Sequence, residues 1–313
     1  MSGVRVYSLP NLGEQVRRVA AELAWRQWAA LGRVAVASRE ARAIVDPEAL
    51  LLLSLGLAEG DGRINRLIPW WAHVGARVLS VQRAKNLVAE YPAGAGAALG
   101  RFARSAVTEG GDQRWRALAG RTTAGRARPK DLGAGPVVSA PPALMLRLRL
   151  AFGVGIKADV LAFLLGMAGG RCTVQQVARA TRYYPRAVRR ALEELAAARF
   201  VMAAPSAPIS YQVDDKAWSA VLSLSGGPPP WRPWQDVFAF LSHLLAWLEA
   251  PATARASDYL SSSKARDLAE AHGAAFDGFG VALRDPAAFP GEAYLEPFTE
   301  TTRQLVERLL DLV

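Results

Sequence analysis

A glycine-containing turn is the first stretch of this 313-residue chain whose residue types could carry chemistry. Gly153, Gly155 and Ala158 have the G-x-G-x-x-A spacing that holds the pyrophosphate of a dinucleotide at the start of a helix. That fold also needs a buried parallel strand before the turn and a second strand after the helix. The preceding run, LMLRLRLAF, would bury Arg147 and Arg149 at a cost on the order of several kcal/mol each if unpaired. No second strand follows, so the spacing does not predict a nucleotide-binding enzyme.

Other motifs give no indication of catalysis or metal binding. The chain contains no P-loop, no H-E-x-x-H and no G-x-S-x-G sequence. His73, His243 and His272 lie far apart in the sequence and have no zinc-site spacing. We therefore expect no enzyme activity, no metal and no cofactor, and ordinary packed or surface histidines.

The compartment is expected to be the cytoplasm. Cys172 is the single cysteine, which excludes a disulfide within the chain and fits a reducing environment. The longest apolar runs, residues 49–58 and 237–248, are shorter than the about 20 residues that cross a bilayer. The N-terminus lacks the apolar segment of a secretory signal, so we expect no membrane partner.

Charge is distributed unevenly along the chain. The net charge is +10, but residues 214–313 contain 8 basic and 14 acidic side chains, which leaves +16 on residues 1–213. This asymmetry indicates a nucleic acid or another anionic surface as partner of the first two thirds. Only five of the 38 basic residues are lysine, which is typical of a GC-rich genome and weakens the arginine count as evidence.

The clearest basic element is the segment PRAVRRALEELAAAR at residues 185–199. It predicts an amphipathic helix that begins at Pro185, with Val188, Ala191, Leu192 and Leu195 inward and the arginines outward. A short helix capped by Thr173, TVQQVARA, precedes it, and the helix IKADVLAFLLGMAG comes before that. The following segment, FVMAAPSAPISYQV, predicts a small β-hairpin.

Three helices and a hairpin in this order, over residues 156–213, resemble the winged helix-turn-helix domain of bacterial transcription regulators. The resemblance is closest at T-V-x-x-V-A-x-A-T-x-Y, at V-x-x-A-L-x-x-L and at the F-V that opens the wing, and it covers under a fifth of the chain. Two positions depart from the pattern. Arg182 stands where relatives usually place a turn glycine, and Tyr184 stands where serine or threonine usually caps the third helix.

The resemblance implies that the third helix enters the major groove of double-stranded DNA. Arginine can pair bidentately with guanine, and a tyrosine hydroxyl can hold a phosphate. The alternative to DNA contact is a solvent-exposed helix face whose arginines reflect codon bias. The candidate DNA-contacting residues are Arg171, Thr173, Gln175, Arg182, Tyr183, Tyr184, Arg186, Arg189 and Arg190.

The predicted fold class is mainly α, with helical regions on both sides of the winged helix. Asp46 and Ser80 are predicted N-caps, and residues 63–92 read either as a helical bundle core or as a second, degenerate DNA-reading motif. The predicted units are a helical domain at 1–103, a basic Gly/Pro/Arg-rich linker at 104–142 with one short helix around Trp115, the winged helix-turn-helix at 143–222, a Pro-rich linker at 223–233 and a helical C-terminal domain at 234–313.

Together these patterns predict a sequence-specific, double-stranded DNA-binding transcription regulator. A homodimer is expected, through the apolar helix at 237–248 or through Val16, Leu23 and Trp28 of the first helix. The alternative is a winged-helix protein-interaction subunit of a toxin–antitoxin or phage-defence assembly, because fold does not fix function. The sequence does not identify a protein partner, a small-molecule effector or an operator.

Overall fold

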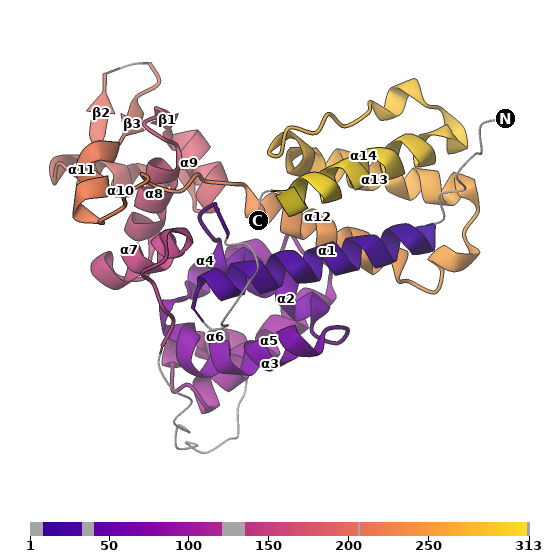
Figure 1. Cartoon of the computed structure of the whole chain (residues 1–313), viewed down its shortest axis with the longest axis horizontal. Coiled ribbons are helices and arrows are strands. Elements are labelled where there is room, and N and C mark those ends of the chain that lie inside the picture. Colours follow the sequence, from indigo (N-terminus) through magenta and orange to yellow (C-terminus); the bar gives the residue numbers. More distant parts are fainter. Residues whose placement is uncertain (1–8, 33–40, 121–134, 206, 312–313) are drawn as a thin grey trace.

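The computed structural model describes residues 9–32, 41–120, 135–205 and 207–311. Within these ranges the chain is mainly helical, as the sequence predicts, with fourteen α-helices and one three-stranded sheet. None of these helices combines the length and the apolar character that crossing a bilayer requires. Figure 1 shows a lobe that holds the sheet on one side and an arm of long helices on the other.

Six helices of the first 120 residues form one part of the larger core. They are α1 (Leu9–Ala30), α2 (Pro47–Leu57), α3 (Gly62–Trp70), α4 (Val81–Val88), α5 (Gly94–Thr108) and α6 (Arg116–Ala119). Both predicted N-caps are confirmed: the Asp46 carboxylate accepts from the Ala49 N–H, and the Ser80 hydroxyl accepts from the Arg83 N–H. Trp70, Trp71, Leu79 and Leu87 are buried, so these apolar side chains of residues 63–92 lie in the bundle core.

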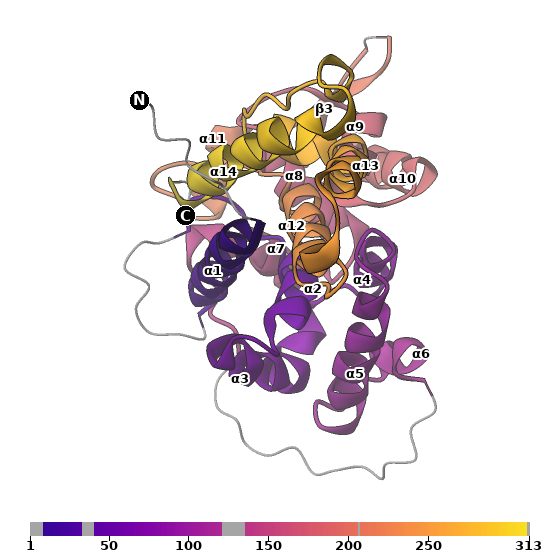
Figure 2. The same cartoon turned by 90° about the vertical axis from the view of Figure 1, so that its right-hand side faces the viewer.

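Three C-terminal helices complete the same core. They are α12 (Trp234–Leu248), α13 (Asp258–Asp277) and α14 (Leu295–Asp311). Figures 1 and 2 show α12 beside α2 and α13, and one continuous hydrophobic cluster joins Trp28 and Leu52 to Phe240 and Phe298. We call α1–α6 together with α12–α14 the helical body. The division of the chain into separate domains stays a prediction. The predicted helical domains at residues 1–103 and 234–313 nevertheless share this core.

The central apolar side chains of both predicted dimer interfaces are buried within one chain. Val237, Phe240 and Leu241 of α12 are fully buried, because α12 packs between α2 and α13. Val16, Leu23 and Trp28 are buried as well. These six side chains are therefore unavailable to a second copy of the chain, and the homodimer stays a prediction.

The predicted linker begins later than the sequence indicates. Helix α5 continues to Thr108, and α6 follows the buried Trp115, whose ring meets Phe102 edge-on at 5.2 Å. Residues 104–119 therefore belong to the helical body, because Trp115 anchors the short helix predicted around it. Residues 121–134 of the linker lie outside the described residues.

The second core belongs to the sheet lobe, a name we use for residues 144–224. Its elements are α7 (Leu144–Phe152), α8 (Ile156–Gly166), β1 (Cys172–Thr173), α9 (Val174–Thr181), α10 (Pro185–Ala197), β2 (Met202–Ala204), β3 (Ser210–Gln212) and α11 (Asp215–Val221). The strands are antiparallel in the order β1-β3-β2, with Tyr211 of β3 paired to Cys172 and Ala203. The predicted hairpin is thus confirmed. The run before Gly153 is a helix rather than a strand.

The Pro-rich segment before α12 connects the two cores through backbone hydrogen bonds. The Trp231 N–H donates to the Gly166 carbonyl at 2.8 Å, and the Ile44 N–H donates to the Pro230 carbonyl at 3.0 Å. The Trp234 indole donates to the Ile44 carbonyl at 2.9 Å. Because Ile44 packs into the sheet-lobe core, the two cores are held together at this point.

Substitution of Gly166 by alanine should weaken this connection. An added Cβ would lie 2.6 Å from the Trp231 nitrogen and 2.8 Å from Ile44 Cδ1, so backbone would have to move. We expect the free energy of unfolding to fall by about 1–3 kcal/mol, as in overpacked cores. Urea unfolding followed by tryptophan fluorescence measures the change.

Gly96→Ala is the matched control for Gly166→Ala. Gly96 lies in α5 with nothing within 4 Å of an added Cβ, so alanine there should stabilise by up to about 1 kcal/mol. Equal effects of the two substitutions would show that the close approach at Gly166 does not constrain the fold.

Candidate nucleic-acid interface

Local sequence fixes the two helices that carry the predicted interface. Thr173 caps α9 in a capping box: its hydroxyl accepts from the Gln176 N–H, and the Gln176 side chain accepts from the Thr173 N–H at 2.8 Å. Helix α10 begins at Pro185, and Tyr184 at its N-cap supplies no side-chain hydrogen bond, as its type predicts. Val188 and Leu192 are buried against the sheet-lobe core and set the outward face of α10.

That outward face of α10 is basic at its leading end. Arg186, Arg189 and Arg190 are exposed, and Tyr184 is 75% exposed. Arg190 pairs with Glu194 at 2.8 Å, whereas Arg186 and Arg189 have no ion pair in the part of the chain that the structure describes.

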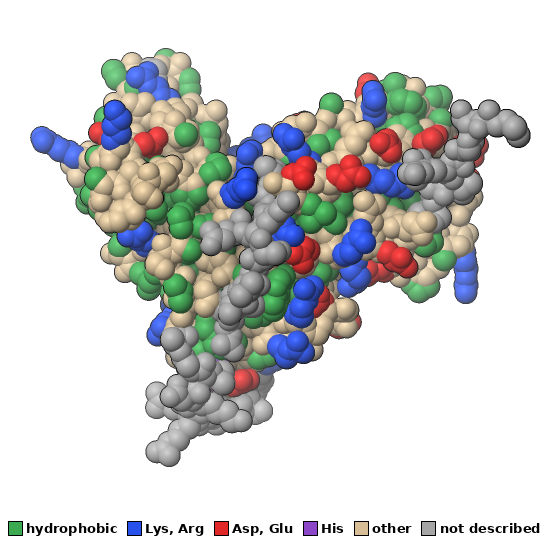
Figure 3. Space-filling view, viewed as in Figure 1, with side chains coloured by type: hydrophobic (Ala, Val, Ile, Leu, Met, Phe, Trp, Pro, Cys, Tyr) green, Lys and Arg blue, Asp and Glu red, His purple; other side chains and the backbone are tan. Residues whose placement is uncertain are grey.

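Acidic side chains gather elsewhere on the molecule. In Figure 3 they are interspersed with basic ones over the arm that contains α1, α13 and α14, and they are sparse on the visible face of the sheet lobe. The two surfaces therefore differ in the balance of their charges.

Three further candidates lie at or near the start of α9. Arg171 and Gln175 are exposed, and the Arg171 guanidinium donates to the Gln212 side chain at 3.2 Å. Thr173 is half-buried, and its hydroxyl is occupied by the capping box. The structure thus leaves Arg171 and Gln175 accessible, whereas Thr173 already has partners.

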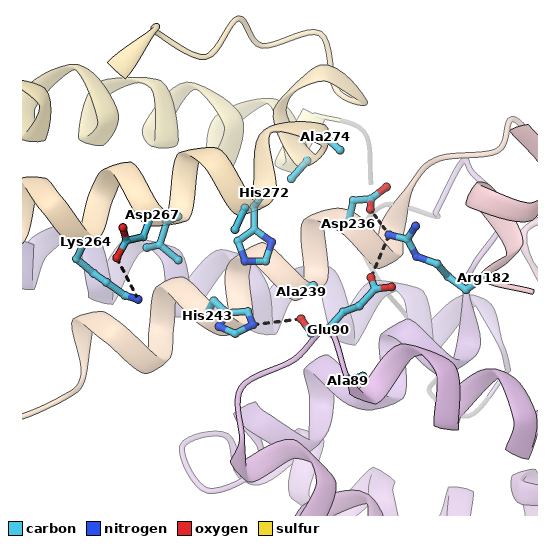
Figure 4. Close-up of a pocket in the computed structure, with 13 residues that line it drawn as sticks. Ala89, Glu90, Arg182, Asp236, Ala239, His243, Lys264, Asp267, His272 and Ala274 are labelled. Atoms are coloured by element: carbon cyan, nitrogen blue, oxygen red, sulfur yellow. Dashed lines mark hydrogen bonds and ion pairs between the residues drawn. The ribbon is translucent and has the colours of Figure 1, made fainter. Parts of the chain in front are cut away.

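Arg182 and Tyr183 do not face outward, which corrects the sequence-based expectation. Arg182 takes the left-handed conformation that its turn position demands (φ 57°, ψ 32°) and caps the end of α9. Its guanidinium contacts Asp236 at 2.5 Å and Glu90 at 3.0 Å, as Figure 4 shows. The Tyr183 hydroxyl donates to the Asp159 carboxylate at 2.8 Å. Turn residues follow no helical periodicity, so their direction was set by these partners.

A buried network of charged side chains lies behind this turn. Arg149 of α7 donates to both carboxylate oxygens of Glu48 at 2.7 and 2.9 Å and to both of Asp159 at 2.7 and 2.9 Å. Arg83 of α4 pairs with Asp46 and, at 3.0 Å, with Glu48. These five residues, which we call the ionic cluster, are each 1% exposed or less.

Mutual pairing favours the charged forms of Glu48, Arg83 and Arg149. Burial opposes ionisation of Glu48, but the charge and hydrogen bonds of Arg149 outweigh it, with help from Arg83, and the pKa of Glu48 lies below its ordinary value. Burial likewise opposes the charged form of Arg149, yet Asp159 and Glu48 hold its pKa above the ordinary value. In the cluster as a whole, three carboxyl groups face two guanidinium groups.

The ionic cluster also fastens the turn between α9 and α10 to the helical body. Arg83 Nε donates to the Thr181 carbonyl at 3.0 Å, and the Asn86 amide donates to the Arg182 carbonyl at 2.7 Å. Tyr183 shares its hydroxyl between Asp159 and Ser80, the latter at 3.2 Å. The turn therefore has fixed partners on α4, at the N-cap of α4 and on α8.

Sequence reasoning missed this cluster, although a signal for it exists. Glu48 and Asp159 stand inside otherwise apolar helical segments, PEALLLL and ADVLAFLL, and Arg149 stands inside LMLRLRL. Charges in such positions are buried only when paired. Because Arg149 is paired with two carboxylates, its burial does not carry the free-energy cost of an unpaired charge.

Two histidines that are distant in the sequence meet beside the turn. His243 of α12 and His272 of α13 have ring centroids 4.9 Å apart, and His243 Nε2 lies 3.1 Å from the Glu90 carbonyl oxygen. Sequence spacing predicts no such pair, because it arises from the packing of two helices. The described residues contain no group of three or more side chains suited to hold a metal ion.

His272 should titrate far below an ordinary histidine. Burial and the positive fields of His243 and Lys264 lower the pKa of His272 to about 4. Because this value lies below that of the unfolded chain, the folded state should lose stability as the pH falls from about 6.5 towards 4. Solvent screening of the half-buried ring limits the loss to about 1 kcal/mol.

NMR titration of the His272 Hε1 resonance tests this expectation, and His272→Gln is the matched variant. The variant should lose less thermal stability than the wild type between pH 7 and pH 5. A midpoint near 6.5 would contradict the buried, neutral state of this imidazole.

No protein-family model, curated protein or solved structure matches this chain. The functional interpretation therefore depends on the geometry of α10 and of the elements that hold it. Those elements are the sheet-lobe core on the inner face of α10 and the ionic cluster behind its leading turn.

Proposed function

We propose that this protein is a cytoplasmic, sequence-specific transcription regulator that binds double-stranded DNA through a winged helix-turn-helix. The order α8, β1, α9, α10, β2, β3 and the β1-β3-β2 sheet agree with that layout. In this interpretation α10 is the recognition helix and the hairpin of β2 and β3 is the wing.

One observation carries the proposal: the leading half of α10 offers exposed cations without exposed acids. Arg186, Arg189 and Arg190 face outward, and the first acidic side chain on the helix is Glu193. Arginines at the tip of such a helix can donate bidentately to guanine or pair with phosphates, and Tyr184 can donate its hydroxyl to a phosphate.

A protein-interaction role is the second candidate, because the same lobe exposes apolar side chains. Leu150, Phe200 and Val221 are 59%, 42% and 73% exposed, and Phe152 packs against Phe200 at 5.5 Å between ring centroids. Exposed apolar patches often mark protein interfaces. Binding through such a patch would depend little on salt, whereas phosphate contacts depend on it steeply.

Fluorescence anisotropy on a random-sequence duplex, across a salt series from about 50 to 300 mM, tests DNA binding directly. Three arginine–phosphate contacts give a slope of log K against log salt of about −3, since each contributes about −0.9. The measurement should show saturable binding with a slope of this size or steeper. Absence of binding at the lowest salt concentration would refute the regulator proposal and favour the protein-interaction role.

A further inference from the structure

A cavity of about 550 Å³ opens between the end of α4 and helices α12 and α13. In Figure 4, Glu90, Arg182 and Asp236 lie at one end, the rings of His243 and His272 lie in the middle, and Lys264 and Asp267 lie at the other end. Alanines of α12 and α13 form much of the remaining wall and leave the space open. Cavities of roughly 300–1,000 Å³ are the usual size for small-molecule sites.

Inside the cavity, the end at Arg182 has more carboxylates than guanidinium groups. Glu90 and Asp236 share this one guanidinium, and the ionic cluster behind it adds three carboxylates against two guanidinium groups. Arg179 acts on Asp236 from the exposed face of α9, outside the cavity. Burial raises the pKa of both Glu90 and Asp236, against the opposing effect of Arg182.

The middle and far end of the cavity favour one orientation of a bound cation. The two imidazoles present flat, uncharged rings, since burial lowers the pKa of His243 and of His272. Lys264, which is 4.0 Å from Asp267 and whose side chain is 47% exposed, makes the far end less favourable for a second positive charge. A ligand would therefore direct its cation towards Glu90 and Asp236 and its uncharged part towards the histidines.

We propose that this cavity binds a small organic cation, with an amine or amidine group between Glu90 and Asp236 and a flat apolar part against His243 and His272. Charge-assisted hydrogen bonds to two carboxylates would fix the cationic group. Because those carboxylates also hold Arg182, the ligand would compete for the contact that ties the α9–α10 turn to α12. The site binds its ligand whether or not α10 binds DNA.

Three probes of nearly the same shape test the charge preference without DNA. Benzamidine is cationic, benzamide is neutral and benzoate is anionic, and NMR shifts of the His243 and His272 Hε1 protons at pH 7.5 follow the binding of each. We expect saturable shifts with benzamidine, affinity at least about tenfold lower for benzamide, and no saturation with benzoate. Benzoate that binds as tightly as benzamidine would overturn the proposal.

Matched variants locate the cation within the cavity. Glu90→Gln should weaken benzamidine binding by at least about tenfold, because the carboxylate becomes an uncharged amide. Lys264→Gln should strengthen it by about two- to threefold, and Glu109→Gln, at the exposed C-cap of α5 and outside the cavity lining, should leave it unchanged. Circular dichroism confirms folding of each variant. Benzamidine affinity of Glu90→Gln within twofold of the wild type, or weaker binding by Lys264→Gln, would overturn the proposal.

Discussion

Replacement of Arg149 by methionine should lower the free energy of unfolding by about 3–5 kcal/mol, the usual effect of removing one partner from a buried ion pair. Arg149 supplies two bidentate interactions, to Glu48 and to Asp159, and Nη1 also donates to the Val78 carbonyl at 3.0 Å. Methionine fills part of the space but leaves both carboxylates without their main counter-charge. Asp159 keeps Tyr183 as a donor, and Glu48 keeps Arg83 and the Ser80 N–H.

Arg147→Met provides the control on the same helix. Arg147 lies two residues before Arg149 in α7, is half-buried, and makes no ion pair among the described residues. Its replacement removes the same charge and adds the same side chain, so we expect a change within about 0.5 kcal/mol. Urea unfolding at pH 7, followed by tryptophan fluorescence and circular dichroism, measures both variants. Equal midpoints for Arg149→Met and Arg147→Met would show that the ionic cluster contributes little to stability.

The sequence predicts local structure well at positions where a single local interaction determines which residue type is favoured. Asp46, Ser80 and Thr173 are N-caps because their side-chain oxygens satisfy backbone N–H groups at helix starts, and all three predictions are confirmed. The inward face of α10 follows from periodicity alone, since Val188 and Leu192 recur at helical spacing.

The sequence predicts much less about which surfaces meet. Periodicity shows that α12 is apolar around most of its circumference, but it does not show whether the covering partner is α2 of the same chain or a second copy. The same limit applies to Arg182 and Tyr183, whose partners Asp236 and Asp159 lie 54 and 24 residues away. Long-range pairing of this kind depends on tertiary packing, so the ionic cluster and the histidine pair were found only in the structure.

Replacement of Arg186, Arg189 and Arg190 together by alanine should remove most of the proposed DNA affinity. All three side chains are exposed on the outward face of α10, so their loss should not disturb the buried face at Val188 and Leu192. We expect the slope of log K against log salt to move towards zero by about 2–3 units and the affinity at about 100 mM salt to fall more than about tenfold. Anisotropy on the random-sequence duplex measures both quantities.

A second triple variant separates the position of the charges from their number. Arg66, Arg101 and Arg116 are exposed on α3, α5 and α6 of the helical body and make no ion pair among the described residues. Their replacement by alanine removes the same three charges at a distance from α10, so long-range attraction of DNA should fall equally in both variants. The control should keep its slope within about one unit of the wild type. If both variants bind DNA like the wild type, the phosphate contacts lie elsewhere, and the basic segment at 104–142 is the first place to search. A loss of affinity confined to the α10 variant would assign the phosphate contacts to α10.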